Sequence, residues 1–217
     1  MISTIKKSLQ DILSPMVLMF ILKVGLGSIA FWIAILWYFW NSFSSFITSY
    51  LTWIPFDWLQ DTVIYIATPL AGYILIIVTI STLTSLYSED VLIALAKKHY
   101  PKVKVVASPT ISGSLGATLS SSLLFLFLVV ILSPLLFIPV VGQAIMLYLW
   151  SILLKSPTVH DVGGLFIKDK KELKQKRKKS NIIAIIASLF NYIPLLNIFA
   201  PLFAQIMFLH YILGENR

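Results

Sequence analysis

Long apolar stretches with almost no charge constrain this chain more than any other feature. The first runs from Met16 to about Trp40, and Lys23 is its only charged residue. A helix of about 20 apolar residues crosses the hydrocarbon core of a bilayer, which is about 30 Å thick. Only 12% of the 217 residues are charged, whereas a soluble domain carries about 25%. The sequence therefore predicts an all-α integral membrane protein with one membrane domain over residues 1–217.

Two long N-terminal transmembrane helices are predicted, at about residues 16–40 and 62–86. Residues 41–61 lie between them and contain no Lys or Arg. Basic residues collect on the cytoplasmic side of a membrane, and Trp and Tyr favour its interfaces. We therefore expect residues 41–61 to form an outer loop at the interface. Lys6 and Lys7 place the N-terminus in the cytoplasm by the same rule.

A short amphipathic helix is predicted over residues 88–99, after the second span. Ser88 is a plausible start, because it is followed by the acidic pair Glu89 and Asp90. The apolar residues of this segment recur at helical spacing, and they are Val91, Leu92, Leu95 and Ala96. Lys97 and Lys98 close the segment and indicate that it lies on the cytoplasmic membrane surface.

The second half of the chain contains two apolar runs broken by proline, at about residues 112–154 and 181–213. Pro139 and Gly142 mark the predicted turn of the first, and Pro194 and Asn197 that of the second. Each piece of the second run has about 13 residues, or about 20 Å of helix, which is too short to cross. We therefore predict two helical hairpins, at least one of them re-entrant.

A basic segment, residues 155–180, separates these two runs and is expected in the cytoplasm. Its charges either set the topology or also bind anionic lipid headgroups. With Lys97 and Lys98, the residues assigned to this role are Lys170, Lys171, Lys174, Lys176, Arg177, Lys178 and Lys179. No aromatic residues alternate with the basic ones, so nucleic-acid binding is not expected. The resulting topology has both termini in the cytoplasm and the bilayer as the main partner.

Few residues suit catalysis or metal binding. The chain has no cysteine, and no carboxylate lies in a predicted span. His160 and Asp161 are predicted to lie in a loop, as a solvated histidine beside a helix-capping aspartate. His99 and His210 are expected to be isolated near the interface. The sequence therefore predicts no enzyme activity, no cofactor and no metal site.

One polar stretch, residues 108–118, precedes and opens the third apolar run. Its small and hydroxyl residues suit an anion at a helix N-terminus, where free amides and a positive dipole end lie. Close helix packing and ordinary capping explain the same residues. The Lys23 side chain either extends along the helix and places its ammonium group among the lipid headgroups, or is buried and functional. The candidate anion-binding residues are Lys23, Ser112, Gly113, Ser114 and Gly116.

The layout resembles the family of CysZ-like sulfate permeases and etoposide-induced-protein membrane proteins. The resemblance rests on Leu13-Ser14-Pro15 before the first span, on Ser85-Leu86-Tyr87-Ser88-Glu89-Asp90-Val91 after the second, and on the two proline-broken hairpins. It covers about Ile5 to Leu213. In the sulfate branch a Gly-Leu-Arg type sequence that helps hold the anion follows the opening proline. Here Pro15 is followed by Met-Val-Leu-Met, so no sulfate-binding residue is carried over.

The resemblance implies a self-associating protein of the inner (plasma) membrane that takes up sulfate. The first hypothesis is accordingly a permease or channel for a small inorganic anion. The alternative is a non-transporting membrane protein that organises lipids or partner proteins through residues 88–99 and the basic run 168–179.

Overall fold

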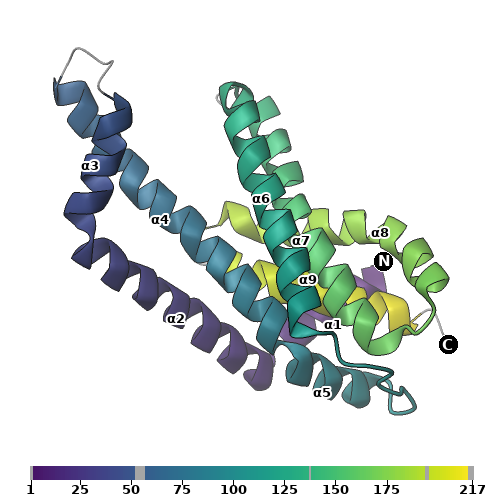
Figure 1. Ribbon diagram of the computed structural model, residues 1–217. Coiled ribbons are helices and arrows are strands. Elements are labelled where there is room, and N and C mark those ends of the chain that lie inside the picture. Colours follow the sequence, from purple (N-terminus) through teal and green to yellow (C-terminus); the bar gives the residue numbers. More distant parts are fainter. Residues whose placement is uncertain (1, 52–56, 137, 194–195, 215–217) are drawn as a thin grey trace.

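The computed structural model of the protein describes residues 2–51, 57–136, 138–193 and 196–214, and within these ranges it contains helices and no strands (Figure 1). The elements are α1 Ile2–Ile12, α2 Pro15–Tyr38, α3 Trp40–Leu51, α4 Asp57–Tyr87, α5 Glu89–His99, α6 Ile111–Leu136, α7 Val141–Phe166, α8 Lys170–Ser188, the 3-10 turns η1 Leu189–Tyr192 and η2 Leu196–Phe199, and α9 Ala200–Gly214.

The residues of the two predicted N-terminal spans form the helices α2 and α4. Pro15 occupies the start of α2, where the missing proline N–H costs no helical hydrogen bond. The two helices pack side by side, and both run diagonally across the view in Figure 1. Trp32 joins them by donating its indole N–H to the Thr79 hydroxyl at 2.8 Å. Pro69 lies inside α4, which continues through it.

Three helical stretches of the described chain are long and apolar enough to cross a bilayer, namely Pro15–Tyr38, Ile111–Leu136 and Leu196–Gly214. Only 17% of the most apolar part of the first two is buried inside the protein, against 89% for the third. Apolar side chains that the protein does not cover need an apolar solvent. The helices α2 and α6 therefore face lipid, whereas Leu196–Gly214 is surrounded by protein.

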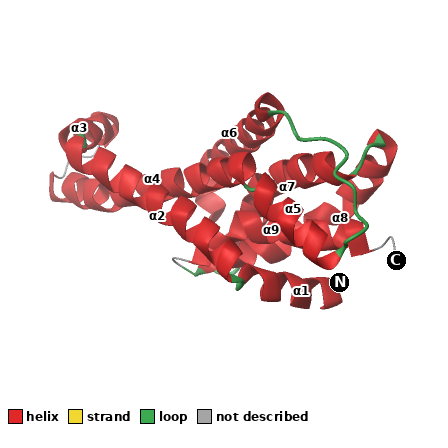
Figure 2. Cartoon of the chain, turned by 90° about the horizontal axis from the view of Figure 1, so that it is seen from below, coloured by secondary structure: helices red, strands yellow, loops and turns green. Residues whose placement is uncertain are grey.

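Helix α9 forms the centre of the fold. Every residue from Ala200 to Leu213 is buried, which is typical of a helix that is apolar on all sides and packed on all sides. Helices α1, α7 and α8 all pack against it, and the view from below shows it enclosed by its neighbours (Figure 2). Two polar side chains of α9, Gln205 and His210, are only 2% exposed.

Helix α5 follows α4 after a bend of 59°. Its buried residues are the four predicted from the sequence, Val91, Leu92, Leu95 and Ala96. All four belong to the same core as α9. The apolar face of α5 therefore packs on the protein itself.

Two predictions about the segments were wrong. Residues 41–51 are helix α3, not loop, while residues 52–56 lie outside the described part. The basic segment 155–180 is mostly helical, because α7 continues to Phe166 and α8 begins at Lys170, and its place in the cytoplasm stays a prediction. The second arm of the last run is longer than 13 residues, since Leu196–Gly214 spans 19. Re-entrance of that hairpin stays a prediction.

The chain breaks between α8 and α9 at the predicted place. Asn197 is buried there and donates its side-chain N–H to the Tyr73 hydroxyl at 2.9 Å, which fastens the break to α4. Gly25 of α2 lies against Ile198, and a Cβ at this glycine would come within 3.2 Å of that side chain. Pro194 lies outside the described residues.

The predicted turn at Pro139 and Gly142 lies between α6 and α7. Val140 has a φ of 67°, which is rare for a β-branched residue and indicates a tight turn. A Cβ at Gly142 would overlap the backbone carbonyl oxygen of Leu136. Backbone atoms cannot move aside as a flexible side chain can, so this position requires glycine.

We predict that Gly142→Ala lowers the free energy of unfolding by about 2 kcal/mol, because the turn must open to admit the methyl group. Gly116→Ala is the matched control, since a Cβ there meets nothing within 4 Å. Alanine is the better helix former by up to about 1 kcal/mol, so this control is expected to be neutral or slightly stabilising. Unfolding by SDS titration, followed by circular dichroism, measures both. Equal stability of the two variants would contradict the assignment.

Candidate functional site

A buried carboxylate, Asp161 of α7, joins four helices. It is 3% exposed. It accepts hydrogen bonds from the hydroxyls of Ser85 on α4 at 2.5 Å and Ser114 on α6 at 2.9 Å, and from the side-chain amide of Gln205 on α9 at 3.1 Å. Burial raises the pKa of this carboxyl group above its usual value, and the hydrogen bonds that it accepts partly offset that rise. Asp161 therefore fixes the relative positions of α4, α6, α7 and α9.

The predicted loop around His160 and Asp161 was wrong, because both residues lie inside helix α7. His160 Nδ1 lies 3.3 Å from Asp161 Oδ1, and the His160 side chain is 36% exposed. Helix α7 continues past the apolar run, and Asp161 is therefore buried among the helices. The sequence had suggested that this residue lies in a solvated loop.

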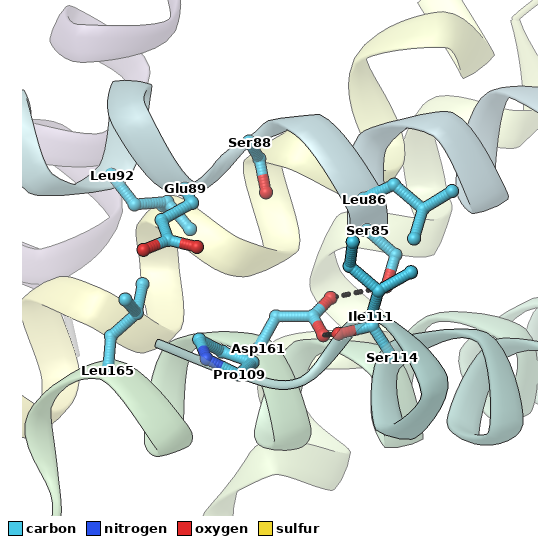
Figure 3. A pocket seen from close by; sticks show the side chains of 10 residues that line it. All are labelled: Ser85, Leu86, Ser88, Glu89, Leu92, Pro109, Ile111, Ser114, Asp161 and Leu165. Atoms are coloured by element: carbon cyan, nitrogen blue, oxygen red, sulfur yellow. Dashed lines mark hydrogen bonds between the residues drawn. The ribbon is translucent and has the colours of Figure 1, made fainter. Parts of the chain in front are cut away.

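A small pocket of about 40 Å³ opens beside Asp161 (Figure 3). It is lined by Ser85, Leu86, Ser88, Glu89, Leu92, Pro109, Ile111, Ser114, Asp161 and Leu165. The Ser88 hydroxyl points toward this space (Figure 3). It is buried and has no hydrogen-bond partner. Glu89 lines the same pocket and accepts a hydrogen bond from Ser108 at 2.6 Å. Two carboxylates in the lining make this pocket unsuited to an anion.

The buried side of α6 carries hydroxyl groups. Its buried residues are Ser114, Thr118, Ser121, Ser122 and Phe125, and we call the first four the hydroxyl face of α6. Ser114 is bonded to Asp161, and Ser121 donates to the carbonyl oxygen of Ala117. The hydroxyls of Thr118 and Ser122 are buried without a partner. They are two of the six buried side-chain atoms that lack a hydrogen-bond partner in the described part of the chain.

The structure separates the candidate anion-binding residues. Ser112 and Gly116 are exposed on α6, and Lys23 is exposed on α2. Ser114 alone is buried, and its hydroxyl is already donated to Asp161. The amide of Gly113 donates to the Thr110 hydroxyl at 3.2 Å, so part of the α6 N-terminus is capped. This arrangement does not favour an anion at the start of α6.

A second buried carboxylate, Asp11 of α1, contacts the two remaining histidines, His99 and His210. His99 Nε2 and His210 Nε2 each lie 2.8 Å from a carboxylate oxygen of Asp11. Lys98 Nζ lies 3.2 Å from the same carboxylate. The expectation that His99 and His210 are isolated was wrong, because α1 packs on α9 and its Asp11 contacts both histidines.

The acidity of Asp11 reflects two opposing effects. Burial would raise the pKa of its carboxyl group. Hydrogen bonds from His99, His210 and Lys98, together with the charge of His99, outweigh burial and hold the pKa of Asp11 below its usual value. The ionised carboxylate is therefore the form that the folded protein favours.

The predicted lipid-facing basic residues are only partly described. Lys97 and Lys171 are exposed, Lys98 bonds Asp11, and the Lys176 ammonium lies 5.4 Å from the ring centre of Tyr211. The side chains outside the described part are those of Lys170, Lys174, Arg177, Lys178 and Lys179. Lipid contact by this group stays a prediction.

The sequence profile of the family described as Sulfate transporter CysZ/Etoposide-induced protein 2.4 matches residues 4–201. No curated protein sequence and no solved structure matches the chain.

Proposed function

Because the chain belongs to the family of the sulfate transporter CysZ and the etoposide-induced protein 2.4, we propose that it is a permease or channel for a small inorganic anion, with sulfate as the first candidate. The family match and the apolar helices make it a multi-pass membrane protein in contact with lipid. The proposal adds a transport role, self-association, and an inner-membrane location with both termini in the cytoplasm.

The observation that carries the proposal is the hydroxyl face of α6. An unpaired buried hydroxyl costs about 1–3 kcal/mol. Thr118 and Ser122 are the two unpaired buried hydroxyls of the described chain that lie on α6. Hydroxyl groups can donate hydrogen bonds to a partly dehydrated anion inside a membrane protein, where water is scarce. Thr118 and Ser122 lie one turn apart on α6, which also carries an apolar outer side toward lipid. We propose that these two hydroxyls contact the transported anion.

Ser114, the residue of the hydroxyl face that is bonded to Asp161, is not part of the proposed anion contact. The Ser114 hydroxyl donates its only proton to Asp161 and so has none to donate to an anion. The proposed contact therefore lies further along α6, at Thr118 and Ser122, and Asp161 acts as a structural link.

Close packing of small residues is the competing explanation for the hydroxyl face. Thr118→Val separates the two explanations, because valine keeps the shape of threonine and removes only the hydroxyl. Ser122→Ala does the same with a small loss of volume. Ser120→Ala is the matched control, since Ser120 is exposed on the same helix.

We expect vesicles containing the purified protein to take up labelled sulfate faster than empty vesicles, and the Thr118→Val/Ser122→Ala double variant to lose most of that uptake. Ser120→Ala should keep it. If the wild type, the double variant and Ser120→Ala take up sulfate equally fast, the transport proposal is kept, but Thr118 and Ser122 are rejected as contacts of the anion. No uptake by the wild type above empty vesicles, across a range of pH, would reject the sulfate proposal itself.

The alternative role in organising lipids or partners has weaker support. It requires an accessible apolar face on α5, but Val91, Leu92, Leu95 and Ala96 are buried against the protein's own core. Absence of transport, combined with tight binding to anionic vesicles that depends on the basic residues of α8, would favour this role instead.

A further inference from the structure

We infer that Asp11, His99 and His210 form a binding site for a divalent transition-metal ion. Each residue offers one ligand atom, and these atoms all lie within 4.8 Å of one another. They come from α1, α5 and α9, so three positions far apart in the sequence converge on one point. Two imidazole nitrogens and one carboxylate oxygen are a ligand set used by zinc and by non-haem iron. The inference does not depend on the proposed transport function.

The distances suit a metal after a small adjustment. A tetrahedral ion with bonds of about 2.0–2.1 Å holds its ligand atoms about 3.3 Å apart. Both histidine nitrogens now lie 2.8 Å from the Asp11 carboxylate, so each pair must open by about half an ångström. Side-chain rotation alone supplies such a shift. The three helices therefore bring both histidine nitrogens close to the spacing from Asp11 that a metal requires, with all three ligand atoms within 4.8 Å of one another.

The surroundings orient the ligands. The Tyr100 hydroxyl lies 3.0 Å from His210 Nδ1, and this contact leaves His210 Nε2 directed at Asp11. Metal-binding histidines characteristically use their second ring nitrogen in this way. The side chains of Asp11 and His210 are each 1% exposed, whereas that of His99 is 24% exposed. An ion can therefore enter from the His99 side.

Lys98 is the group that a metal must displace. Its ammonium lies 3.2 Å from Asp11 and its side chain is 58% exposed, so it can turn into solvent when an ion neutralises the carboxylate. The bound ion would fasten α1 and α5 to the buried helix α9. The chemistry of the ligands favours zinc, cobalt or nickel over magnesium or calcium, which prefer oxygen ligands only.

The test uses the full chain, purified without a polyhistidine tag and kept in detergent micelles. Titration with Co²⁺, followed by visible absorption, reports imidazole coordination, and elemental analysis after Zn²⁺ loading gives the stoichiometry. We expect one ion per chain, and roughly tenfold or greater weakening by His99→Gln and by His210→Gln. His160→Gln is the matched control, because His160 is the third histidine of the chain and lies beside Asp161. That variant should bind as the wild type does.

Size-exclusion profiles and circular dichroism show whether each variant is folded. If His210→Gln does not fold, His99→Gln decides the outcome, since His99 is partly exposed. Substoichiometric binding by the wild type would overturn the inference and leave a hydrogen-bonded cluster only. The same conclusion follows if folded His99→Gln binds as tightly as wild type, or if His160→Gln weakens binding equally.

Discussion

Replacing Asp161 with alanine is expected to lower the free energy of unfolding by about 3 kcal/mol or more. The carboxylate accepts hydrogen bonds from Ser85, Ser114 and Gln205, each on a different helix. Removing it leaves three buried donors without a partner, and each unsatisfied group costs about 1–3 kcal/mol. Asp161→Asn keeps the shape and one acceptor oxygen, so its loss should be about half as large.

The control for this change is Asp90→Ala, because Asp90 is an exposed aspartate at the start of α5. Exposed substitutions of this kind usually change stability by about 0.5 kcal/mol or less. SDS titration followed by circular dichroism compares the three variants with the wild type. If Asp161→Ala proved as stable as Asp90→Ala, Asp161 would not link the four helices.

Replacing Asp11 with alanine is expected to cost about 3 kcal/mol. It removes the common acceptor of His99 and His210, and His210 is nearly completely buried. The lost contacts join α1 and α5 to α9, so α1 should detach first. Limited proteolysis within residues 2–14, compared with the wild type and with Asp90→Ala, would detect this release. Unchanged protection of α1 would contradict the prediction.

The same carboxylate predicts a dependence of stability on pH. The pKa of Asp11 is lowered in the folded protein, so the folded state favours the ionised form. Its contribution is therefore complete above the unfolded pKa of about 3.9 and is lost as the pH falls through the lower folded pKa. The difference in stability between wild type and Asp11→Asn should shrink below about pH 4. A constant difference over that range would show that Asp11 is not the titrating group.

The apolar spans were predictable because lipid imposes a strong and local rule on sequence. An apolar run of sufficient length, with a single charged residue, identifies α2 wherever the rest of the chain lies. The spacing of Val91, Leu92, Leu95 and Ala96 likewise identified the buried face of α5. Proline and asparagine together located the break before α9, although proline alone does not end a helix in this chain, since α4 continues through Pro69. The burial of α9 was not predictable, because an apolar helix has the same sequence pattern whether it faces lipid or protein.

The buried polar clusters were not predictable from the sequence. Asp161 follows the apolar part of α7 by several residues, and loop and helix are equally compatible with that position. Asp11, His99 and His210 are separated by 88 and 111 residues, so only the packing of α1 and α5 on α9 reveals their contact. The helical spacing of Ser114, Thr118, Ser121 and Ser122 did carry a signal, because these positions fall on one face of a helix.

Labelled-sulfate exchange tests the transport proposal most directly, because it requires no knowledge of the energy source. Vesicles containing the purified protein are loaded with unlabelled sulfate and placed in a trace of labelled sulfate. The proposal predicts accumulation of label above that in protein-free vesicles, and most of this accumulation should disappear in the Thr118→Val/Ser122→Ala variant but persist in Ser120→Ala. Label entry no faster than into protein-free vesicles, with folded protein present in the bilayer, would contradict it.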